Sequence, residues 1–286
     1  MKHSFYKKLK KVTVFSLLCI LSITVFLLVY GNFSLKTTEF TISDSNIPTT
    51  FSGFKIAQIS DLHNAQIGKN NRRLLSKLKA VQPDIIVITG DLVDSSHTDI
   101  PVAIDFAKAA VEIAPVYYVS GNHEAWLSEN DFLTLKQSLS MAGVQILENE
   151  KTDIELNGEA ITLIGVDDPD LQVSDDGFFF TDSVEMLASE SDNYTVLLSH
   201  RPEYFDCYVN SGVNLTLSGH THAGQIRLPF IGAMIAPGQG LFPEYDKGIF
   251  REKDTVMIVS AGLGNSVIPF RFLNNPELVI IELLQA

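Results

Sequence analysis

The sequence predicts an α/β domain that is preceded by a single membrane-spanning helix. Residues 12–30 form an uncharged apolar run. From residue 51 onward, short apolar stretches alternate with amphipathic ones, which is the pattern of strands and helices in α/β proteins. Five of the apolar stretches end at Asp, Asn or His. Functional groups of open α/β sheets gather at the carboxyl ends of strands, so we expect the functional site at these ends.

The N-terminal run is long enough to cross a membrane. Its 19 residues carry no charge, and at a rise of about 1.5 Å per residue such a helix spans a hydrocarbon core of roughly 30 Å. Five lysines and no acidic residue precede it, so the positive-inside rule places the basic tail, residues 1–11, in the cytoplasm. We therefore expect a single-pass protein of the cell membrane with an extracytoplasmic domain. A cleaved signal peptide and a buried core helix are the alternatives.

The rest of the chain is strongly acidic. The 286 residues include 21 basic and 34 acidic side chains; five of the basic ones lie in the tail, so the remainder has 16 basic and 34 acidic residues and a net charge of −18. Such a surface repels polyanions, so we expect no nucleic-acid partner. A phosphate substrate remains compatible, because bound cations reverse the charge locally. The oligomeric state is left open.

Residues 31–50 are polar and are expected to form a linker or a first edge strand ahead of a folded domain over residues 51–286. Strands are expected at residues 54–59, 85–88, 116–119, 194–198 and 215–217. Helices are expected near residues 74–78, 101–113, 128–142 and 181–190. Residues 144–166 alternate like strands, and Asn157-Gly158 within them is a strong hairpin signal. The C-terminal part adds at least two strands.

Five short motifs at strand ends hold five of the seven histidines. They are Asp61-Leu62-His63, Gly90-Asp91-Leu92-Val93-Asp94, Gly121-Asn122-His123-Glu124, His200 and Gly219-His220-Thr221-His222. If these strands are neighbours, one pocket collects mixed nitrogen and oxygen ligands for divalent metals. The candidates outnumber the four ligands of one tetrahedral zinc. Two ions about 3.5–4 Å apart are therefore expected, with a bridging hydroxide that attacks phosphorus.

The ordered motif set, which spans residues 61–222, resembles that of the calcineurin-like metallophosphoesterases. The sequences around the first and last motifs resemble a membrane-associated subgroup that includes phosphodiesterases and UDP-diacylglucosamine pyrophosphatases. The resemblance implies a four-layer α/β/β/α sandwich, in which two packed sheets are flanked by helices. The last motif commonly has a second glycine where this chain has Ala223, a small difference.

The resemblance also implies that seven side chains bind two divalent ions, which could be Mn, Fe, Zn or Co. The ligands of the first ion would be Asp61, His63 and His222. Those of the second would be Asn122, His200 and His220, with Asp91 bridging the two. His123 would act in catalysis, by stabilising the transition state or protonating the leaving oxygen. Asp94 and Glu124 are candidates for orienting the ligands, and Glu124 could instead be a helix-start carboxylate.

The expected reaction is metal-dependent hydrolysis of a phosphodiester or pyrophosphate bond. A lipid-linked substrate is favoured, because the anchor would hold the site near a membrane. A nucleotidase and a protein phosphatase are alternatives within the same chemistry. A membrane-tethered interaction module that uses metals only for structure is the alternative from a different class.

Three further segments each have two interpretations. Arg201 could contact phosphate or belong to a turn. The acidic residues Asp167, Asp168 and Asp170 are expected to form a solvated turn, or else to lie at the pocket rim. Residues 226–250 are apolar and rich in Gly and Pro, and could form an apolar wall or lid beside the metals or pack as ordinary core.

Overall fold

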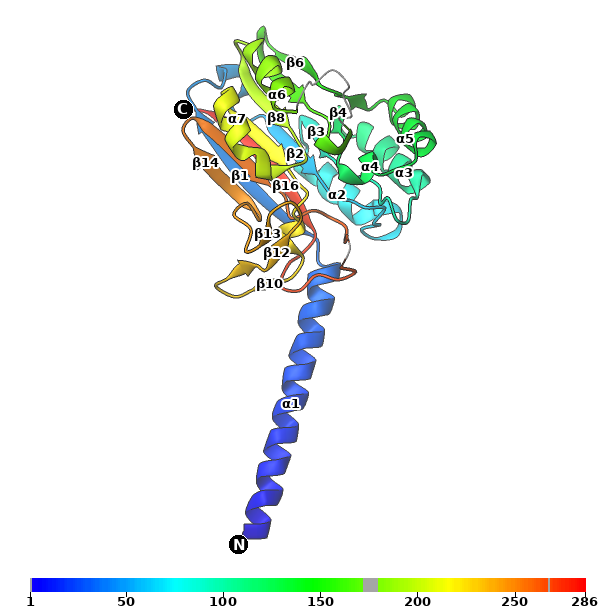
Figure 1. The fold of residues 1–286 in the computed structure, drawn as a ribbon, viewed down its shortest axis with the longest axis vertical. Coiled ribbons are helices and arrows are strands. Elements are labelled where there is room, and N and C mark those ends of the chain that lie inside the picture. The colour runs from blue at the N-terminus through cyan, green and yellow to red at the C-terminus, as the bar shows by residue number, and fades with distance from the viewer. Residues whose placement is uncertain (1, 172–179, 267) are drawn as a thin grey trace.

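The structure is a computed structural model that describes residues 2–171, 180–266 and 268–286. Within these residues, two six-stranded sheets pack against each other and helices cover their outer faces, while one long helix projects from the domain (Figure 1). This confirms the α/β/β/α sandwich and the apolar N-terminal helix.

The first sheet brings the ends of three motif-bearing strands to one edge. Its order is β1 (Lys36–Asp44), β16 (Glu277–Gln285), β2 (Lys55–Ile59), β3 (Ile85–Thr89), β4 (Val116–Val119) and β5 (Gln145–Ile146). Strands β2 to β5 are mutually parallel, so their carboxyl ends share an edge. Strand β16 runs antiparallel to β2 and parallel to β1. Both β1 and β16 therefore begin at the edge where β2 ends.

The second sheet supplies the other motif-bearing strands. Its order is β14 (Gly248–Glu252), β15 (Thr255–Val259), β9 (Leu215–Ser218), β8 (Tyr194–Leu198), β7 (Glu159–Gly165) and β6 (Glu150–Leu156). Strands β7, β8, β9 and β15 are parallel. The predicted hairpin joins β6 to β7, and both turn residues have positive φ, 52° at Asn157 and 88° at Gly158, as a type I′ turn requires.

Three apolar layers hold the sandwich together. The side chains of β3 show why its sequence is wholly apolar, because Ile86 and Ile88 pack under the helices while Ile85 and Val87 face the second sheet. The helices over the first sheet are α2 (Arg72–Val81), α3 (Ile100–Val111) and α5 (Glu129–Met141). Those over the second are α6 (Phe180–Ser189) and α7 (Phe205–Ser211). Short helical turns lie at Thr49–Phe51, Lys69–Asn71, Asn122–Ala125 (α4), Pro169–Leu171, Pro202–Tyr204 and His222–Gly224.

Helix α1 (Lys2–Phe33) stands apart from the sandwich (Figure 1). Its segment Lys10–Phe33 has a mean hydropathy of 2.8 and is not buried, so by length and composition it can cross a membrane. Among the described side chains of α1, those near its C-terminal end contact the domain. There the Asn32 side chain donates to the Arg271 carbonyl (2.9 Å) and accepts from the Arg271 amide (2.9 Å).

Residues 226–250 form two small hairpins and the start of β14. Strand β10 (Arg227–Leu228) pairs with β11 (Gly232–Ala233), and β12 (Ile235–Ala236) pairs with β13 (Gly240–Leu241). Phe230 and Phe242 are exposed. These two aromatic side chains are therefore not packed in the core, as one of the two interpretations expected.

Two truncated chains would test the contribution of β1 to stability. A chain of residues 31–286 keeps β1, whereas a chain of residues 51–286 exposes the edge of β16 and loses Ile42 and Ile47, both buried between the sheets. Two buried isoleucines contribute about 3–6 kcal/mol, so we expect the shorter chain to melt about 10 °C or more below the longer one. Equal melting temperatures by circular dichroism would contradict this expectation.

Candidate metal centre

The fold brings all seven predicted ligand residues to one buried edge of the sandwich. Each follows the carboxyl end of a parallel strand, and the strands belong to both sheets. In strand order they are Asp61 and His63 after β2, Asp91 after β3, Asn122 after β4, His200 after β8, and His220 and His222 after β9. All seven side chains are buried.

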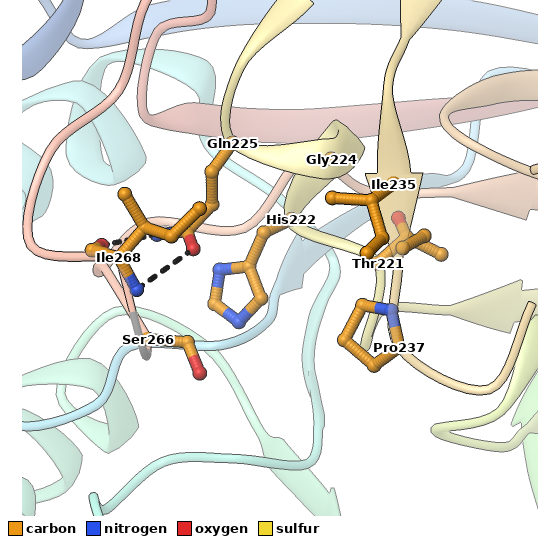
Figure 2. Close-up of a pocket in the computed structure, with 9 residues that line it drawn as sticks. Thr221, His222, Gly224, Gln225, Ile235, Pro237, Ser266 and Ile268 are labelled. Carbon is orange, nitrogen blue, oxygen red and sulfur yellow. Dashed lines mark hydrogen bonds between the residues drawn. The ribbon is translucent and has the colours of Figure 1, made fainter. Parts of the chain in front are cut away.

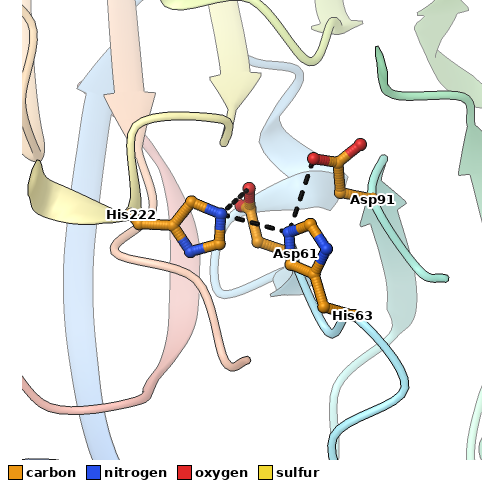
Figure 3. Close-up of side chains that lie close together, drawn as sticks. All are labelled: Asp61, His63, Asp91 and His222. Atoms are coloured by element: carbon orange, nitrogen blue, oxygen red, sulfur yellow. Dashed lines mark hydrogen bonds and ion pairs between the residues drawn. The ribbon is translucent and has the colours of Figure 1, made fainter. Parts of the chain in front are cut away.

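The first group comprises Asp61, His63, Asp91 and His222, whose ligand atoms lie within 4.8 Å of one another (Figure 3). His63 Nε2 lies 3.1 Å from His222 Nε2. His222 Nε2 lies 3.4 Å from Asp61 Oδ1, and His63 Nε2 lies 3.5 Å from Asp91 Oδ2. The loops after three strands, β2, β3 and β9, thus contribute four ligand atoms that lie close together.

The second group comprises Asp91, His200 and His220, which satisfy the same distance limit. His200 Nε2 lies 3.2 Å from Asp91 Oδ2 and 3.2 Å from His220 Nδ1. It also lies 3.2 Å from Asn122 Oδ1. Asp91 belongs to both groups, so one carboxylate lies between two sets of ligand atoms.

The surroundings of the His200 ring are those of a histidine that binds a divalent cation. His200 Nδ1 lies 2.8 Å from the Thr89 carbonyl and donates to it, so the neutral ring has its lone pair on Nε2. That nitrogen faces oxygens of Asp91 and Asn122. A backbone carbonyl behind the ring and acceptor atoms in front of it form the usual environment of a metal-binding histidine. The mixed nitrogen and oxygen donor set fits Mn, Fe, Zn or Co.

Burial controls the protonation of three histidines of the site, and neighbouring charges control that of Asp91 and His200. Burial lowers the pKa of His63 to about 4 and holds the pKa values of His220 and His222 well below their usual range. These rings are therefore neutral, as metal ligands must be. Although burial opposes both effects, His200 holds the pKa of Asp91 well below its usual range, and Asp91 with other carboxylates raises the pKa of His200 to about 10. The carboxylates thus attract positive charge into the site.

The backbone at the site adopts conformations that L-residues rarely take. Five of the seven candidates have φ between 47° and 70°: Asp61, His63, Asp91, His220 and His222. Each such residue costs roughly 1–2 kcal/mol, and strain of this kind clusters at functional sites. Two motif glycines permit close approach, because a Cβ at Gly219 would collide with Ser60 and Asp61, and one at Gly121 would collide with Asp91.

Glu124 joins the loop after β3, which carries Asp91, to the loop after β4, which carries Asn122. Its carboxylate accepts from the amides of Asp91 (2.8 Å), Val93 (3.1 Å) and Gly121 (2.7 Å). The bond to Gly121 caps α4, as the helix-start interpretation expects, and the bonds to Asp91 and Val93 are compatible with an orienting role. Burial raises the pKa of Glu124 to about 7. Asp94 is less closely linked to the candidate ligands, because its Oδ2 lies 3.7 Å from His63 Nδ1.

His123 lies beside the first group without belonging to it. Its ring is 4.4 Å from that of His63, and its amide donates to Asp91 Oδ1 at 2.8 Å. The Ser95 amide donates to His123 Nδ1 at 3.1 Å. Because Nδ1 accepts this bond, the proton of the neutral ring lies on Nε2.

Arg271 and Asn274 also support the site, and sequence analysis missed both. Arg271 is fully buried, donates to the Ala261 carbonyl at 2.8 Å and lies 3.5 Å from His222 Nδ1. The Asn274 side chain donates to the His222 carbonyl at 2.8 Å. Neither residue belongs to a motif, and only the folding of their loop onto the end of β9 reveals them.

The acidic turn after β7 differs from the prediction. Asp168 is 1% exposed and binds Arg201 through both carboxylate oxygens, at 2.6 and 2.8 Å. The expectation of a solvated turn is therefore wrong for Asp168. Arg201 also pairs with Asp170 at 2.9 Å and lies near Glu203. Because three carboxylates surround this guanidinium, a structural role is favoured over phosphate binding.

The sequence that carries these strand-end residues matches a family of known proteins. Residues 54–224 match the family model described as calcineurin-like phosphoesterase. The chain therefore belongs to the calcineurin-like phosphoesterase family. Members of this family use divalent metals, and the chain is a metal-dependent phosphoester hydrolase.

Similar proteins agree with this assignment. The Bacillus subtilis metallophosphoesterase YkuE is 32% identical over 260 residues, which cover 87% of this chain and 85% of YkuE. A transmembrane protein with a metallophosphoesterase domain from Bos taurus is 29% identical and matches 84% of this chain and 55% of its own length. The structure of the NAD nucleotidase from Haemophilus influenzae superposes with a TM-score of 0.50 at 16% identity, over 73% of this chain and 50% of the nucleotidase, and it shares the fold.

Replacing Glu124 with Gln would test its orienting role. The amide keeps the size of the side chain but points an NH₂ group at backbone donors, so we expect Asp91 to lose its position. Ligand-orienting contacts affect metal affinity by about 10- to 100-fold, and a drop of that size is expected in metal titrations. Glu129→Gln, on the exposed first turn of α5, is the matched control. Equal metal affinity in both variants would refute the role.

Proposed function

We propose that the chain is a membrane-anchored two-metal hydrolase that cleaves phosphodiester or pyrophosphate bonds in lipid-linked substrates. The observation that carries the two-metal proposal is Asp91, which belongs to both ligand groups. One ion would be held by Asp61, His63 and His222, and the other by Asn122, His200 and His220. Apart from Asn122, which contacts His200, these residues all belong to the two groups that meet at Asp91.

Two bound divalent ions supply Lewis-acid charge for the phosphoryl oxygens and lower the pKa of water so that it can attack near neutral pH. The protein positions the reactants. The Asp91 carboxylate is held between the ligand groups by the His123 amide and, through its own backbone, by Glu124. A phosphate drawn to this point meets imidazole side chains from both ligand groups.

The hydrogen bonds of His123 support a role toward the leaving group. Its Nδ1 is occupied by the Ser95 amide, so the proton lies on Nε2. We propose that this N–H donates a hydrogen bond to the leaving oxygen as the P–O bond breaks, while the attacking water forms the new P–O bond and its proton passes to the leaving oxygen. A hydrogen bond aimed at negative charge that develops in the transition state contributes about 10²- to 10³-fold.

A cavity lies beside His222 and has room for an apolar part of the substrate next to the scissile phosphate (Figure 2). This cavity supports the proposal of a lipid-linked substrate. Its volume is about 270 Å³, and Ile235, Ala236, Pro237 and Ile268 line it together with His222. The Gln225 side chain bonds to both backbone groups of Ile268 (2.7 and 3.3 Å) and closes this wall. An apolar cavity of this kind suits the lipid part of a substrate better than a sugar or a second phosphate.

The anchoring part of the proposal rests on α1 and its charges. The helix is long and apolar enough to span a membrane. The lysines that precede its apolar segment favour a cytoplasmic N-terminus, which would place the metal centre outside the cytoplasm.

Replacing His123 with Ala separates catalysis from metal binding. We expect the full-length variant to lose about 10²- to 10³-fold in kcat on a chromogenic phosphodiester, because it lacks the hydrogen bond to the leaving oxygen. Metal content, measured by mass spectrometry, should stay within twofold of the wild type. If both proteins bind metal but hydrolyse no phosphoester or pyrophosphate, the metal-dependent interaction module becomes the better description.

Acid should release metal before it unfolds the protein. Burial raises the pKa of Asp61 to about 6, so this carboxylate is a ligand above that pH and becomes protonated below it. We expect metal content to fall between pH 7 and pH 5 and to recover on return to neutral pH. Chelation at neutral pH should likewise abolish hydrolysis, and added Mn²⁺ should restore it. Full metal occupancy and activity at pH 5 would contradict the proposed ligation by Asp61.

A further inference from the structure

The membrane helix joins the domain at the same edge as the metal centre. Lys36, the first residue of β1, pairs with Glu277 at the start of β16, and β16 runs antiparallel to β2. Both strands therefore begin where β2 ends, just before Asp61. Figure 1 also shows β10, β12 and β13 on the side of the domain from which α1 projects.

Direct contacts make this proximity specific. Asn32 at the end of α1 bonds to both backbone groups of Arg271. The Arg271 side chain lies 3.5 Å from His222. The Asn275 side chain donates to the Tyr30 carbonyl at 3.0 Å. One loop thus connects the end of α1 with a candidate metal ligand.

Exposed apolar side chains are concentrated on this side of the molecule. We call Phe230, Ile231, Leu241, Phe242 and Phe270 the apolar rim; each is at least 41% exposed. Phe230 lies at the tip of the β10–β11 hairpin with φ 67°, and Phe242 follows β13 with φ 53°. Turns with such φ values favour Gly or Asn. Large aromatic side chains held there, outside the core, mark an interaction surface.

Basic side chains flank the end of α1 on its other side. Residues 64–83 contain five basic and no acidic residues, although the chain after the tail is strongly acidic. We call Lys69, Arg72, Arg73 and Lys77 the basic patch. Arg73 donates to the Phe33 carbonyl at 2.9 Å, and Lys77 donates to Thr37 Oγ1 at 3.1 Å. The patch therefore lies against the point at which α1 leaves the domain, where lipid phosphates would meet it.

We propose that the apolar rim and the basic patch dock the domain onto the bilayer that holds α1, with the metal centre facing the lipid headgroups. This inference rests on the membrane anchoring in the proposed function. The rim enters the interface between headgroups and acyl chains, while the patch binds the phosphates of anionic lipids. Because α1 confines the domain to the membrane surface, weak contacts suffice to hold it in this orientation.

Tryptophan fluorescence of the full-length protein in vesicles tests the docking. Trp126 is the single tryptophan, so in a Trp126→Phe background either Phe230→Trp or Met141→Trp supplies the probe. Met141 ends α5, is 89% exposed and lies on a helix away from α1 (Figure 1). In phosphatidylglycerol–phosphatidylcholine vesicles with brominated acyl chains, we expect at least about threefold stronger quenching of the probe at 230. Equal quenching at the two positions would overturn the proposal.

The basic patch has its own test in the same vesicles. The double variant Lys69→Glu, Arg72→Glu in the Phe230→Trp background should lose about half of the quenching when phosphatidylglycerol is present. With phosphatidylcholine alone, the double variant and its parent should be quenched equally. If the double variant is quenched as strongly as its parent in phosphatidylglycerol vesicles, the patch does not bind anionic lipid.

Activity measurements separate docking from the proposed function. The variant Phe230→Asp, Phe242→Asp should hydrolyse a lipid-linked nitrophenyl phosphodiester in vesicles at least about tenfold more slowly than the wild type. Its rate on a soluble nitrophenyl diester should stay within twofold, as for Met141→Asp. Equal loss on both substrates would overturn the role of the rim. If the wild type hydrolyses neither diester, the proposed function fails, while the quenching still decides whether the domain docks.

Discussion

The carboxylate of Asp91 is the group on which the metal centre depends. It is buried within reach of His63 on one side and His200 on the other. A buried charge is costly unless it is paired and hydrogen-bonded. The His123 amide donates to Asp91 Oδ1, and Glu124 accepts from the Asp91 amide. The ends of β3 and β4 are therefore fixed to each other at the point where the two ligand groups meet.

The metal centre needs both sheets of the sandwich, because neither sheet alone carries all the candidate ligands. The first sheet provides the ligands after β2, β3 and β4, and the second provides those after β8 and β9. The apolar layer between the sheets, which includes Val87 and Val196, sets the distance between these edges. The strained backbone at Asp61 and His222 turns their side chains toward the common centre. Core packing offsets the cost of that strain, so stability and ligand placement are linked.

Local sequence patterns predicted much of this arrangement. The strands, the main helices and the Asn157-Gly158 hairpin follow from periodicity and turn chemistry, which act over a few residues. The pairing of two sheets came from the family resemblance, since periodicity does not show which strands are neighbours. Asp168 was predicted to be solvated because its partner Arg201 lies 33 residues away. Arg271 lacked any local signal, because its contact with His222 depends on how a C-terminal loop closes over the site.

The direction of one edge strand determines where the metal centre lies relative to the proposed anchor. Strand β1 is parallel to β16, and β16 is antiparallel to β2, so β1 begins at the carboxyl edge of β2. An antiparallel β1 would have placed the end of α1 at the opposite edge, far from the ligands. The contact between Asn32 and Arg271 holds the observed arrangement in place. In a single-pass protein, this topology would keep the scissile phosphate near the headgroup layer without a separate targeting domain.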